Sequence, residues 1–287
     1  MKEGMGLNYI TLDLEWNQPA PDCKTVHQLT TEIIQIGAVK MDDSFLIIDQ
    51  FKADVRPRFY PQIKHEVQQL TGISEEQLKQ GMSFPQAVQQ LQQWCGQEFA
   101  LITWSHEDVP VLRKNMEVYQ MEFGWLPDAY DLQIVYSLQQ LGKYQQTALV
   151  KAMVQMGMEP ELTAHDALHD ALYTAQLCQK LDMEKGIGEY NIYQKEAAKG
   201  RAIAVKTQDG YTTPEQAHED DALREFVCPE CGMEMKSQPW EKQKGVKRTA
   251  KTHCPTHGDF EIRLRIQPRR NQTFRARAAL YQIEEKE

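Results

Sequence analysis

The sequence predicts an α/β protein, in which helices flank a mixed β-sheet and a small second module follows. Three strand-like runs come first, within residues 7–55. A fourth apolar run, at residues 99–104, is then interleaved with helical patterns that continue to about residue 181. Strands that first follow one another and then alternate with helices are typical of a sheet covered by helices. Two short cysteine motifs beyond residue 225 indicate the second module.

Composition favours a folded protein that does not span a membrane. The chain has 287 residues, enough for one catalytic domain and a smaller module, and 41% of them are hydrophobic. No apolar run approaches the length of a membrane helix, and the N-terminus lacks the apolar core of a signal peptide. Three of the six cysteines fall in one C-terminal block, which suits a reducing compartment. We therefore expect a cytoplasmic protein without a membrane partner.

The elements can be predicted in chain order. Residues 7–15 are rich in aromatic and β-branched side chains, and strands at residues 32–40 and 45–55 should continue them as an antiparallel meander. Helical patterns follow at residues 62–70, 75–80, 84–95, 109–119, 132–140, 146–157 and 165–181. Residues 183–200 have a charged helical pattern, and residues 201–224 have the polar composition of a linker. The predicted organisation is a domain at 1–185, a helical extension and linker at 186–224, and a module at 225–287.

Two acidic residues stand at the end of the first predicted strand. Because side chains alternate along a strand, Asp13 and Glu15 share one face, while Leu12 and Leu14 point to the other. Neighbouring carboxylates repel each other unless a cation lies between them. Taken alone, the pair fits a solvated acidic strand end as well as a metal site.

A third carboxylate, Asp108, comes just after the apolar run at residues 99–104, at the start of a predicted helix. Pro110 suits the first turn of that helix, because its missing N–H would be unpaired there in any case. Asp108 therefore has two interpretations, as a metal ligand or as no more than a helix N-cap.

The third cluster opens the helix predicted at residues 165–181. Asp170 lies five residues after His165, so both side chains can reach one site if His165 is still on the preceding loop. His165 would then accept a proton from a water molecule while Asp170 holds a metal ion. His169 and Asp166 are alternatives that spacing does not exclude, and a histidine at a helix start can also be purely structural.

Four carboxylates and one imidazole are groups that can hold two divalent cations for phosphodiester hydrolysis. In this order they resemble the DEDDh 3′→5′ exonucleases of the ribonuclease H-like fold, most of all the branch of histone-mRNA and RNA-interference exonucleases. The resemblance covers roughly residues 7–182. It rests on Asp-x-Glu at 13–15, EIIQIGAV at 32–39, LTGI at 70–73 after His65, FPQA at 84–87, Asp108, and HDALHDA at 165–171.

The resemblance implies a mixed five-stranded sheet and a site for two Mg²⁺ or Mn²⁺ ions. The implied metal ligands are Asp13, Glu15, Asp108 and Asp170. Asp13 would bridge the two ions, and His165 would be the general base. Asp108 fits the family pattern better than Glu107 because of the residues that follow it. The implied reaction is hydrolysis at the 3′ end of RNA or DNA, which releases nucleoside 5′-monophosphates.

Substrate contacts are predicted at four residues. Leu70 and Thr71 belong to the segment that resembles the lining of the family's 3′-nucleotide pocket. Many members have a small residue after the glutamate of the first motif, where this chain has Trp16. Trp16 could offer a stacking face for a base or pack in the core. Trp104, at the end of the fourth strand, completes the predicted set.

The C-terminal module carries two knuckle motifs, Cys228-x2-Cys231 and Cys254-x2-His257, with 22 residues between them. A glycine follows each motif and permits a tight turn. Three thiolates and one imidazole suit a closed tetrahedral Zn²⁺ site, so the module resembles a zinc ribbon with one structural zinc ion. A module this small is expected to need the ion to fold.

Charge is distributed unevenly along the chain. Residues 221–287 contain 14 Lys and Arg against 10 Asp and Glu, a net charge of +4; because the whole chain carries −9, residues 1–220 carry −13. Arg263 and Arg265 alternate with apolar residues, which places both cations on one face of a strand. Such a face can bind nucleic-acid phosphates or dock on the acidic first domain. The alternative function is therefore a non-catalytic nucleic-acid-binding protein driven by the ribbon, and no protein partner can be predicted.

Overall fold

The computed structural model describes residues 7–20, 25–26, 29–160, 165–198, 201–242, 248–269 and 272–283. The chain forms two compact units, and the division falls within one helix: the first unit ends at Ile192 and the second begins at Tyr193. Each unit has its own sheet and its own hydrophobic core.

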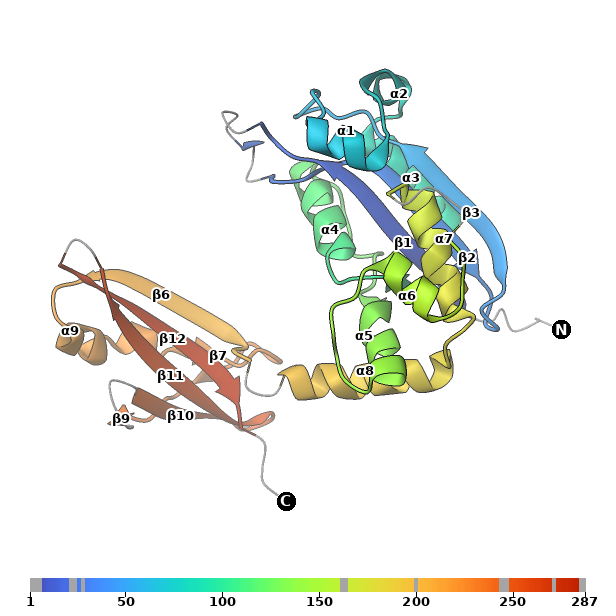
Figure 1. Ribbon diagram of the computed structural model, residues 1–287. Coiled ribbons are helices and arrows are strands. Elements are labelled where there is room, and N and C mark those ends of the chain that lie inside the picture. Colours follow the sequence, from blue (N-terminus) through green and yellow to red (C-terminus); the bar gives the residue numbers. More distant parts are fainter. Residues whose placement is uncertain are drawn as a thin grey trace. The chain divides into compact units, whose positions relative to one another are not determined.

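The first unit is built on a mixed five-stranded sheet with the strand order β3-β2-β1-β4-β5 (Figure 1). The strands β1, β2 and β3 pair antiparallel, whereas β4 pairs parallel with both β1 and β5. The predicted meander and mixed sheet are thus confirmed, although the pattern of residues did not reveal the three-residue strand β5. The strands are β1 (Asn8–Asn17), β2 (Glu32–Met41), β3 (Ile47–Asp54), β4 (Phe99–Thr103) and β5 (Ala129–Asp131).

Helices cover both faces of this sheet. The helix α3 illustrates why they begin where they do: Ser83 and Gln86 form a capping box, and a proline occupies the first turn. The helix α5 continues directly into a π-helical turn, η2. The helices are α1 (His65–Thr71), α2 (Glu75–Gln80), α3 (Phe84–Cys95), α4 (Asp108–Val118), α5 (Leu132–Tyr136), η2 (Ser137–Leu141), α6 (Leu149–Gln155), α7 (Ala167–Cys178) and α8 (Met183–Ala198).

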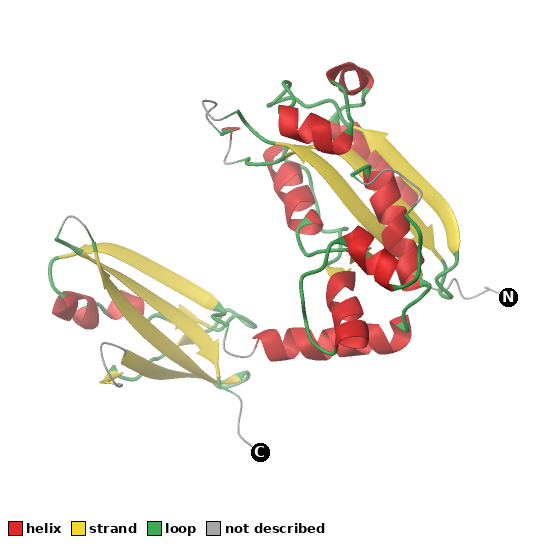
Figure 2. Cartoon of the chain, in the orientation of Figure 1, coloured by secondary structure: helices red, strands yellow, loops and turns green. Residues whose placement is uncertain are grey.

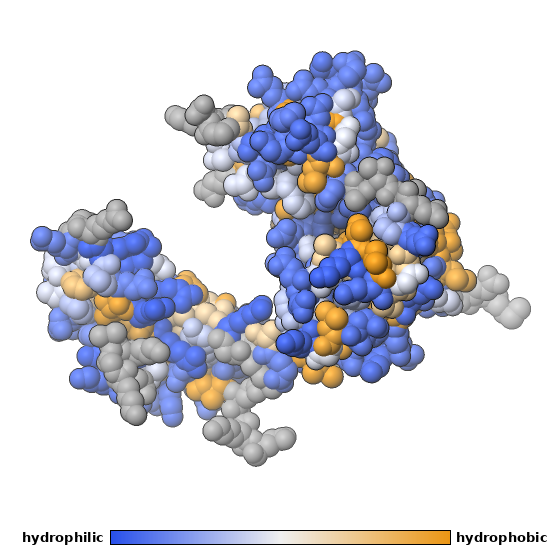
Figure 3. Space-filling model, in the orientation of Figure 1, coloured by the Kyte–Doolittle hydropathy of each residue, from blue (hydrophilic) through white to orange (hydrophobic). Residues whose placement is uncertain are grey.

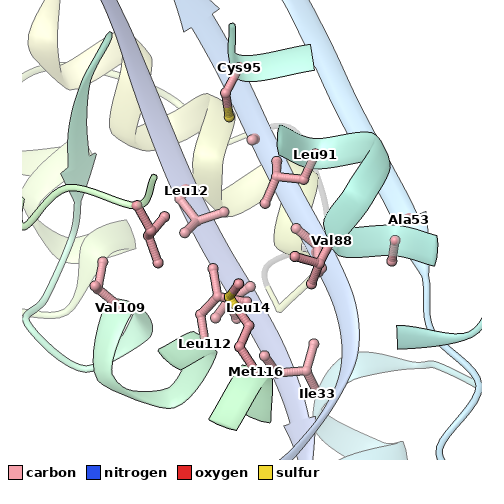
Figure 4. Packing of buried hydrophobic residues seen from close by; sticks show 14 of the residues in the cluster. Leu12, Leu14, Ile33, Ala53, Val88, Leu91, Cys95, Val109, Leu112 and Met116 are labelled. Atoms are coloured by element: carbon pink, nitrogen blue, oxygen red, sulfur yellow. The ribbon is translucent and has the colours of Figure 1, made fainter. Parts of the chain in front are cut away.

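The apolar positions of β1 form a core on one face of the sheet. Leu12 and Leu14 are buried there against Leu91 of α3 and Leu112 of α4 (Figure 4). Burying a leucine side chain contributes about 1.5–3 kcal/mol, so this face is firmly occupied by apolar packing. The opposite face of β1, which carries Asp13 and Glu15, is left to the helix α7.

The second unit holds a five-stranded antiparallel sheet with the order β6-β12-β11-β10-β9 and a two-stranded sheet β7-β8 (Figure 2). One face of the larger sheet packs on a core that includes Phe226, Phe260 and Ile262. The elements are β6 (Ala204–Tyr211), α9 (Pro214–Glu219), the 3₁₀ helix η3 (Asp221–Leu223), β7 (Phe226–Val227), β8 (Glu234–Met235), β9 (Glu241–Lys242), β10 (Arg248–Cys254), β11 (Gly258–Pro268) and β12 (Phe274–Gln282).

One prediction about this part of the chain was wrong. The predicted linker at residues 201–224 contains β6 and α9, and β6 pairs with β12 from Ala204 to Tyr211. A polar composition concealed a strand whose hydrogen-bonding partner lies far away in the sequence. By contrast, the strand predicted from the alternation of Arg263 and Arg265 with apolar residues is present as part of β11.

Within the described residues, no helix combines the length and the hydrophobicity that crossing a membrane requires. The face of the molecule seen in Figure 3 is mostly hydrophilic, and its hydrophobic surface is divided among small patches.

Candidate active site and metal centre

Five residues predicted from three distant segments line one cavity of about 680 Å³ in the first unit. Asp13 and Glu15 come from β1, Asp108 is the first residue of α4, and His165 and Asp170 stand at the beginning of α7. The cavity lies where β1 and its parallel neighbour β4 approach their carboxyl ends. This is the usual position of ligand sites in open α/β sheets.

Alternation along β1 sets the direction of the first two carboxylates. Asp13 stands opposite Gly37 of β2 and Glu15 stands opposite Gln35. The register then shifts between Glu15 and Trp16, which marks a β-bulge directly beside the cavity. Bulges often lie next to active sites, because they reorient the side chains that follow.

The helix α7 lies unusually close to the sheet and thereby brings Asp170 to the cavity. A side chain at Gly37 would lie 2.1 Å from the carbonyl carbon of Ala167, so only glycine permits this approach. Two hydrogen bonds hold the helix: the Thr11 hydroxyl donates to the Ala171 carbonyl at 2.8 Å, and the Ala167 N–H donates to Gln35 Oε1 at 2.9 Å. The position of Asp170 therefore depends on β1 and β2 as well as on its own helix.

His165 stands just before α7 in a left-handed backbone conformation, with φ of 63°. Such a conformation is uncommon for residues other than glycine and often occurs at functional sites. Ligand atoms of His165, Asp170 and Glu15 all lie within 4.8 Å of one another. The imidazole is exposed, so it borders both the carboxylates and solvent.

The alternatives to His165, Asp108 and Asp170 occupy different positions. Asp166 is the N-cap of α7: its Oδ1 accepts hydrogen bonds from the Leu168 and His169 N–H groups at 3.1 and 3.4 Å, and its Oδ2 pairs with Lys52. Glu107 is exposed, whereas Asp108 is only 5% exposed and lines the cavity. The N-cap position of α4 belongs to Glu107, so Asp108 does not serve as the cap.

Burial and mutual repulsion raise the pKa values of the clustered carboxyls. Burial, followed by the charges of Asp108, Asp170 and Glu15, raises the pKa of Asp13 well above its usual range. Burial, followed by the charge of Asp170, raises the pKa of Glu15 to about 8. Burial also raises the pKa of Asp108 to about 7, although hydrogen bonds from its own N–H and that of Leu14 lower it. A bound cation would reverse these shifts by supplying the missing positive charge.

Asp170 gives a direct test of whether these residues fit a metal ion. Its Oδ2 accepts a hydrogen bond from the His165 N–H at 3.1 Å, whereas its buried Oδ1 finds no donor among the described residues. A buried carboxylate oxygen without a partner is costly. Hard cations such as Mg²⁺ prefer carboxylate oxygens, and several are gathered here. The residues present therefore fit a divalent-metal centre.

The four predicted substrate residues also line the cavity, but they differ in exposure. Leu70 is 54% exposed and Thr71 is 8% exposed. Trp16 packs partly against the core of Leu12 and Leu14. Trp104 is buried, and its Nε1 donates to the Thr147 carbonyl at 3.0 Å.

One wall of the cavity was missed by the sequence analysis. Gln133 and the segment 146–149 line it, and Gln133 Nε2 donates to the Thr147 carbonyl at 3.1 Å. No motif marks these residues, and a short glutamine-rich stretch is their only local feature. They reach the cavity only because α5 and α6 fold back toward β4.

The second predicted metal centre lies in the second unit. Cys228 Sγ and Cys254 Sγ lie 3.5 and 3.6 Å from His257 Nδ1, and Cys231 Sγ lies 3.7 Å from Cys254 Sγ. Tetrahedral zinc with usual bond lengths would place two sulfurs about 3.8 Å apart and a sulfur and nitrogen about 3.6 Å apart. The four side chains therefore fit a tetrahedral ion of this size.

The backbone of the two knuckles explains this convergence. Gly232 and Gly258 have φ of 71° and 83°, so each glycine adopts the left-handed conformation expected from the sequence. The Gly232 N–H donates to the Cys228 carbonyl at 2.8 Å, and the Cys228 N–H donates to the Met233 carbonyl at 2.8 Å. These bonds close a tight turn that aims both cysteines at one point.

Comparison with known proteins gives matches that centre on the first unit. The exonuclease family model (RNase T) matches residues 10–178. Among curated proteins, the probable 3′-5′ exonuclease KapD of Bacillus subtilis (strain 168) is 28% identical over 179 residues, which cover 61% of this chain and 85% of that protein.

Solved structures share the fold. The nuclease domain of 3′hExo, a DEDDh family member bound to rAMP, has a TM-score of 0.54 at 19% identity, over 63% of this chain and 94% of that one. Cell-death related nuclease 4 has a TM-score of 0.53 at 20% identity, over 61% of this chain but only 64% of its own length. E. coli exonuclease I in complex with a dT13 oligonucleotide has a TM-score of 0.51 at 14% identity, over 85% of this chain and 55% of that one.

Proposed function

The chain belongs to the exonuclease family, and from this premise we propose that it releases nucleoside 5′-monophosphates from the 3′ ends of nucleic acids by metal-dependent hydrolysis. The enzyme class predicted from the sequence, a 3′→5′ exonuclease, agrees with the family match and with the curated relative. The observation that carries the mechanistic proposal is the convergence of five chemically suited side chains on one cavity.

Two Mg²⁺ or Mn²⁺ ions would be held by Asp13, Glu15, Asp108 and Asp170. When bound, such ions polarise a phosphodiester and stabilise the charge that develops as it is cleaved. The Oδ1 of Asp170, which has no partner in the described part of the chain, and the raised pKa values of Asp13 and Glu15 support this assignment.

His165 would be the general base. Its exposed imidazole can accept a proton at the cavity and pass it to solvent. Its backbone N–H donates a hydrogen bond to Asp170 Oδ2 at 3.1 Å, which holds the base next to one of the proposed metal ligands. The left-handed backbone at His165 is strained, so the surrounding contacts must compensate for its cost. We infer that this conformation serves to aim the imidazole ring at the cavity.

The terminal nucleoside would bind against Leu70 and Trp16, with Thr71 beneath them. The exposed Leu70 offers apolar surface to a base or sugar, and the rim of Trp16 offers a stacking surface. Trp104 would act through its hydrogen bond to Thr147, which holds the opposite wall in place. Both RNA and DNA are candidate substrates, because the similar structures include one with rAMP and one with a DNA oligonucleotide.

The experiment that tests this function is a time course on a 5′-labelled single-stranded RNA and its DNA counterpart. Reactions contain Mg²⁺, Mn²⁺ or EDTA. We expect a metal-dependent ladder that shortens from the 3′ end, and the relative rates would identify the preferred sugar. Cleavage of a circular substrate, or an intact substrate under every metal condition, would contradict the proposal.

We also propose one structural Zn²⁺ ion at Cys228, Cys231, Cys254 and His257. The distances among the four side chains and the two glycine turns support this site. The ion would join the β7-β8 hairpin to the end of β10.

A further inference from the structure

The second unit presents an open, basic sheet face that the proposed catalysis does not use. Along β11, Ile262 and Leu264 are buried in the core, whereas Arg263 and Arg265, which alternate with them, are exposed. Arg277 of β12 is exposed on the same side, because it stands directly opposite Arg265. An antiparallel sheet can cover one face with apolar packing and leave the other to a ligand.

The placement of Arg265 opposite Arg277 is unfavourable for folding alone. Like charges directly opposite each other on antiparallel strands are destabilising. Neither guanidinium makes an ion pair with a carboxylate in the part of the chain that the structure describes, whereas the neighbouring Arg275 pairs with Asp209 at 2.6 Å. Two adjacent, unneutralised guanidiniums are what a phosphate-binding surface requires.

An aromatic platform lies beside these arginines. The guanidinium of Arg263 lies 4.1 Å from the ring centroid of Tyr281, so the two planar groups are in contact. They border a cavity of about 570 Å³ on this face, which is also lined by Glu261, Arg265 and Arg277. Three arginines against one glutamate give these side chains a net charge of +2. Arg248 also borders the cavity, but it stands opposite the buried Leu264 and so belongs to the other face of the sheet.

We propose that this face, formed by β11 and β12, binds the backbone of single-stranded nucleic acid. Arg265 and Arg277 would contact consecutive phosphates, because a guanidinium matches phosphate oxygens in a bidentate geometry. Tyr281 and Arg263 would stack on a base, which is how proteins hold single strands without reading their sequence. The inference rests on the proposed function, since the bound strand would be the exonuclease's own substrate.

The chemistry of the face favours nucleic acid over an acidic protein surface. Carboxylates would satisfy the arginines but would leave the partly exposed ring of Tyr281 without a function. A single strand supplies both phosphates and flat bases, and so uses the two arginines without a carboxylate partner among the described residues as well as the ring of Tyr281. Glu261 is already paired with Arg263. Docking on the acidic residues of the first unit is the competing occupant that the experiment must separate.

The test is a binding titration of the full chain by fluorescence anisotropy, with 5′-labelled 30-nucleotide RNA and DNA in EDTA. EDTA prevents turnover, so the result does not depend on whether the proposed catalysis is correct. The double variant Arg265→Gln and Arg277→Gln is expected to bind about tenfold more weakly, with a salt dependence shallower by about 1.4 in the log–log slope. The control variant, Lys180→Gln and Lys195→Gln, removes two exposed positive charges elsewhere and should bind like the wild type.

Three outcomes would overturn the inference. Equal affinities of the wild type and the arginine variant would mean that the face does not bind the strand. Tighter binding by the arginine variant would indicate that the face docks on an acidic protein surface instead. An equal loss of affinity in the lysine control variant would indicate non-specific electrostatic attraction.

The melting temperature of the arginine variant is the control for folding. A value at or above that of the wild type would exclude misfolding and would fit the removal of a repulsive pair.

Discussion

At the scale of single residues, the cavity separates groups that a local sequence pattern leaves equivalent. Asp166 and Asp170 lie in the same short segment, yet Asp166 caps a helix while Asp170 keeps a buried oxygen that has no partner among the described residues. Glu107 and Asp108 are adjacent, yet only Asp108 lines the cavity. Burial and hydrogen bonding therefore distinguish the proposed metal ligands from their neighbours.

Asp13→Asn and His165→Ala should separate a metal ligand from a general base. We expect both variants to lose turnover by on the order of 1,000-fold, because each removes a group that the reaction requires. Asp13→Asn should also weaken Mn²⁺ binding measured by calorimetry, whereas His165→Ala should retain it. Glu98→Gln, an exposed carboxylate elsewhere, is the control and should change neither quantity. Turnover that survives in either variant would refute the assignment.

The raised pKa of Glu15 predicts how stability depends on pH without metal. Its pKa rises from 4.5 to about 8 on folding, so its stabilising contribution is complete below pH 4.5 and is lost as pH rises through 8. The Glu15→Gln variant has no ionisable group at this position, so it does not lose this stability as pH rises. In EDTA, the variant should therefore gain stability relative to the wild type between pH 5 and pH 9, by at least about 1 kcal/mol, since one pKa unit is worth about 1.4 kcal/mol.

Thermal unfolding of the wild type and Glu15→Gln at several pH values checks this expectation. The same comparison with Glu98→Gln should give a difference that does not vary with pH. A difference for Glu15→Gln that stays constant or shrinks toward pH 9 would contradict the proposed environment. Added Mn²⁺ should stabilise the wild type most at high pH, where the carboxylates are ionised.

At the scale of elements, one helix decides whether the site exists. The helix α7 carries Asp170 and rests on the backbone of β2 at Gly37, with Thr11 and Gln35 holding it by hydrogen bonds. The sequence analysis identified both the helix and the strand. The contact between them depends on a missing side chain, which a pattern of apolar residues does not reveal.

Gly37→Ala tests this contact. Its new methyl group would meet backbone atoms of Ala167 and Leu168, which cannot move without shifting α7. We expect a loss of about 2 kcal/mol or more in the free energy of unfolding, together with reduced Mn²⁺ affinity as Asp170 moves. Denaturant titration measures the first effect and calorimetry the second.

Gly188→Ala is the matched control for this substitution. Gly188 is exposed on α8 and has open space around it, so alanine there should be neutral or slightly stabilising. If Gly37→Ala behaves like Gly188→Ala, the close approach of α7 to the sheet is not what positions the site.

At the scale of the whole molecule, the two units have separate cores and separate candidate metal sites. The first unit would take hard cations on oxygen ligands, and the second would take zinc on sulfur and nitrogen. We therefore expect each unit to respond on its own to the removal of its proposed metal. The open basic face would be a third functional surface, in the same unit as the proposed zinc.

Zinc removal should destabilise the second unit selectively. We expect one zinc ion per chain by atomic absorption and none in the Cys254→Ser variant, because a tetrahedral site needs all four ligands. Calorimetric unfolding of this variant should show one transition lowered and the transition of the first unit unchanged. Cys95→Ser, a buried cysteine of the first unit, should retain zinc. A full complement of zinc in Cys254→Ser would contradict the site.

Features that depend on local interactions were predicted from the sequence, whereas strands that depend on a distant partner were not. Alternation in residues 12–15 and 262–265 predicted correctly which side chains share a face, because successive side chains along a strand point to opposite sides. The helical patterns predicted at residues 75–80 and 84–95 likewise coincide with α2 and α3. By contrast, β5 and β6 were missed, because each is held by a partner strand and not by a pattern of its own.

The sequence by itself determined which residues are chemically able to act: four carboxylates and a histidine in the order of a known family, and four ligands at zinc-ribbon spacing. Side-chain chemistry and spacing are local properties, so they can be read without a fold. Tertiary structure decided that Asp13, Asp108 and Asp170 share a cavity, that Gln133 and Thr147 wall it, and that Arg265 faces Arg277. These are relations between segments far apart in the chain, and they arise only when strands pair and helices pack.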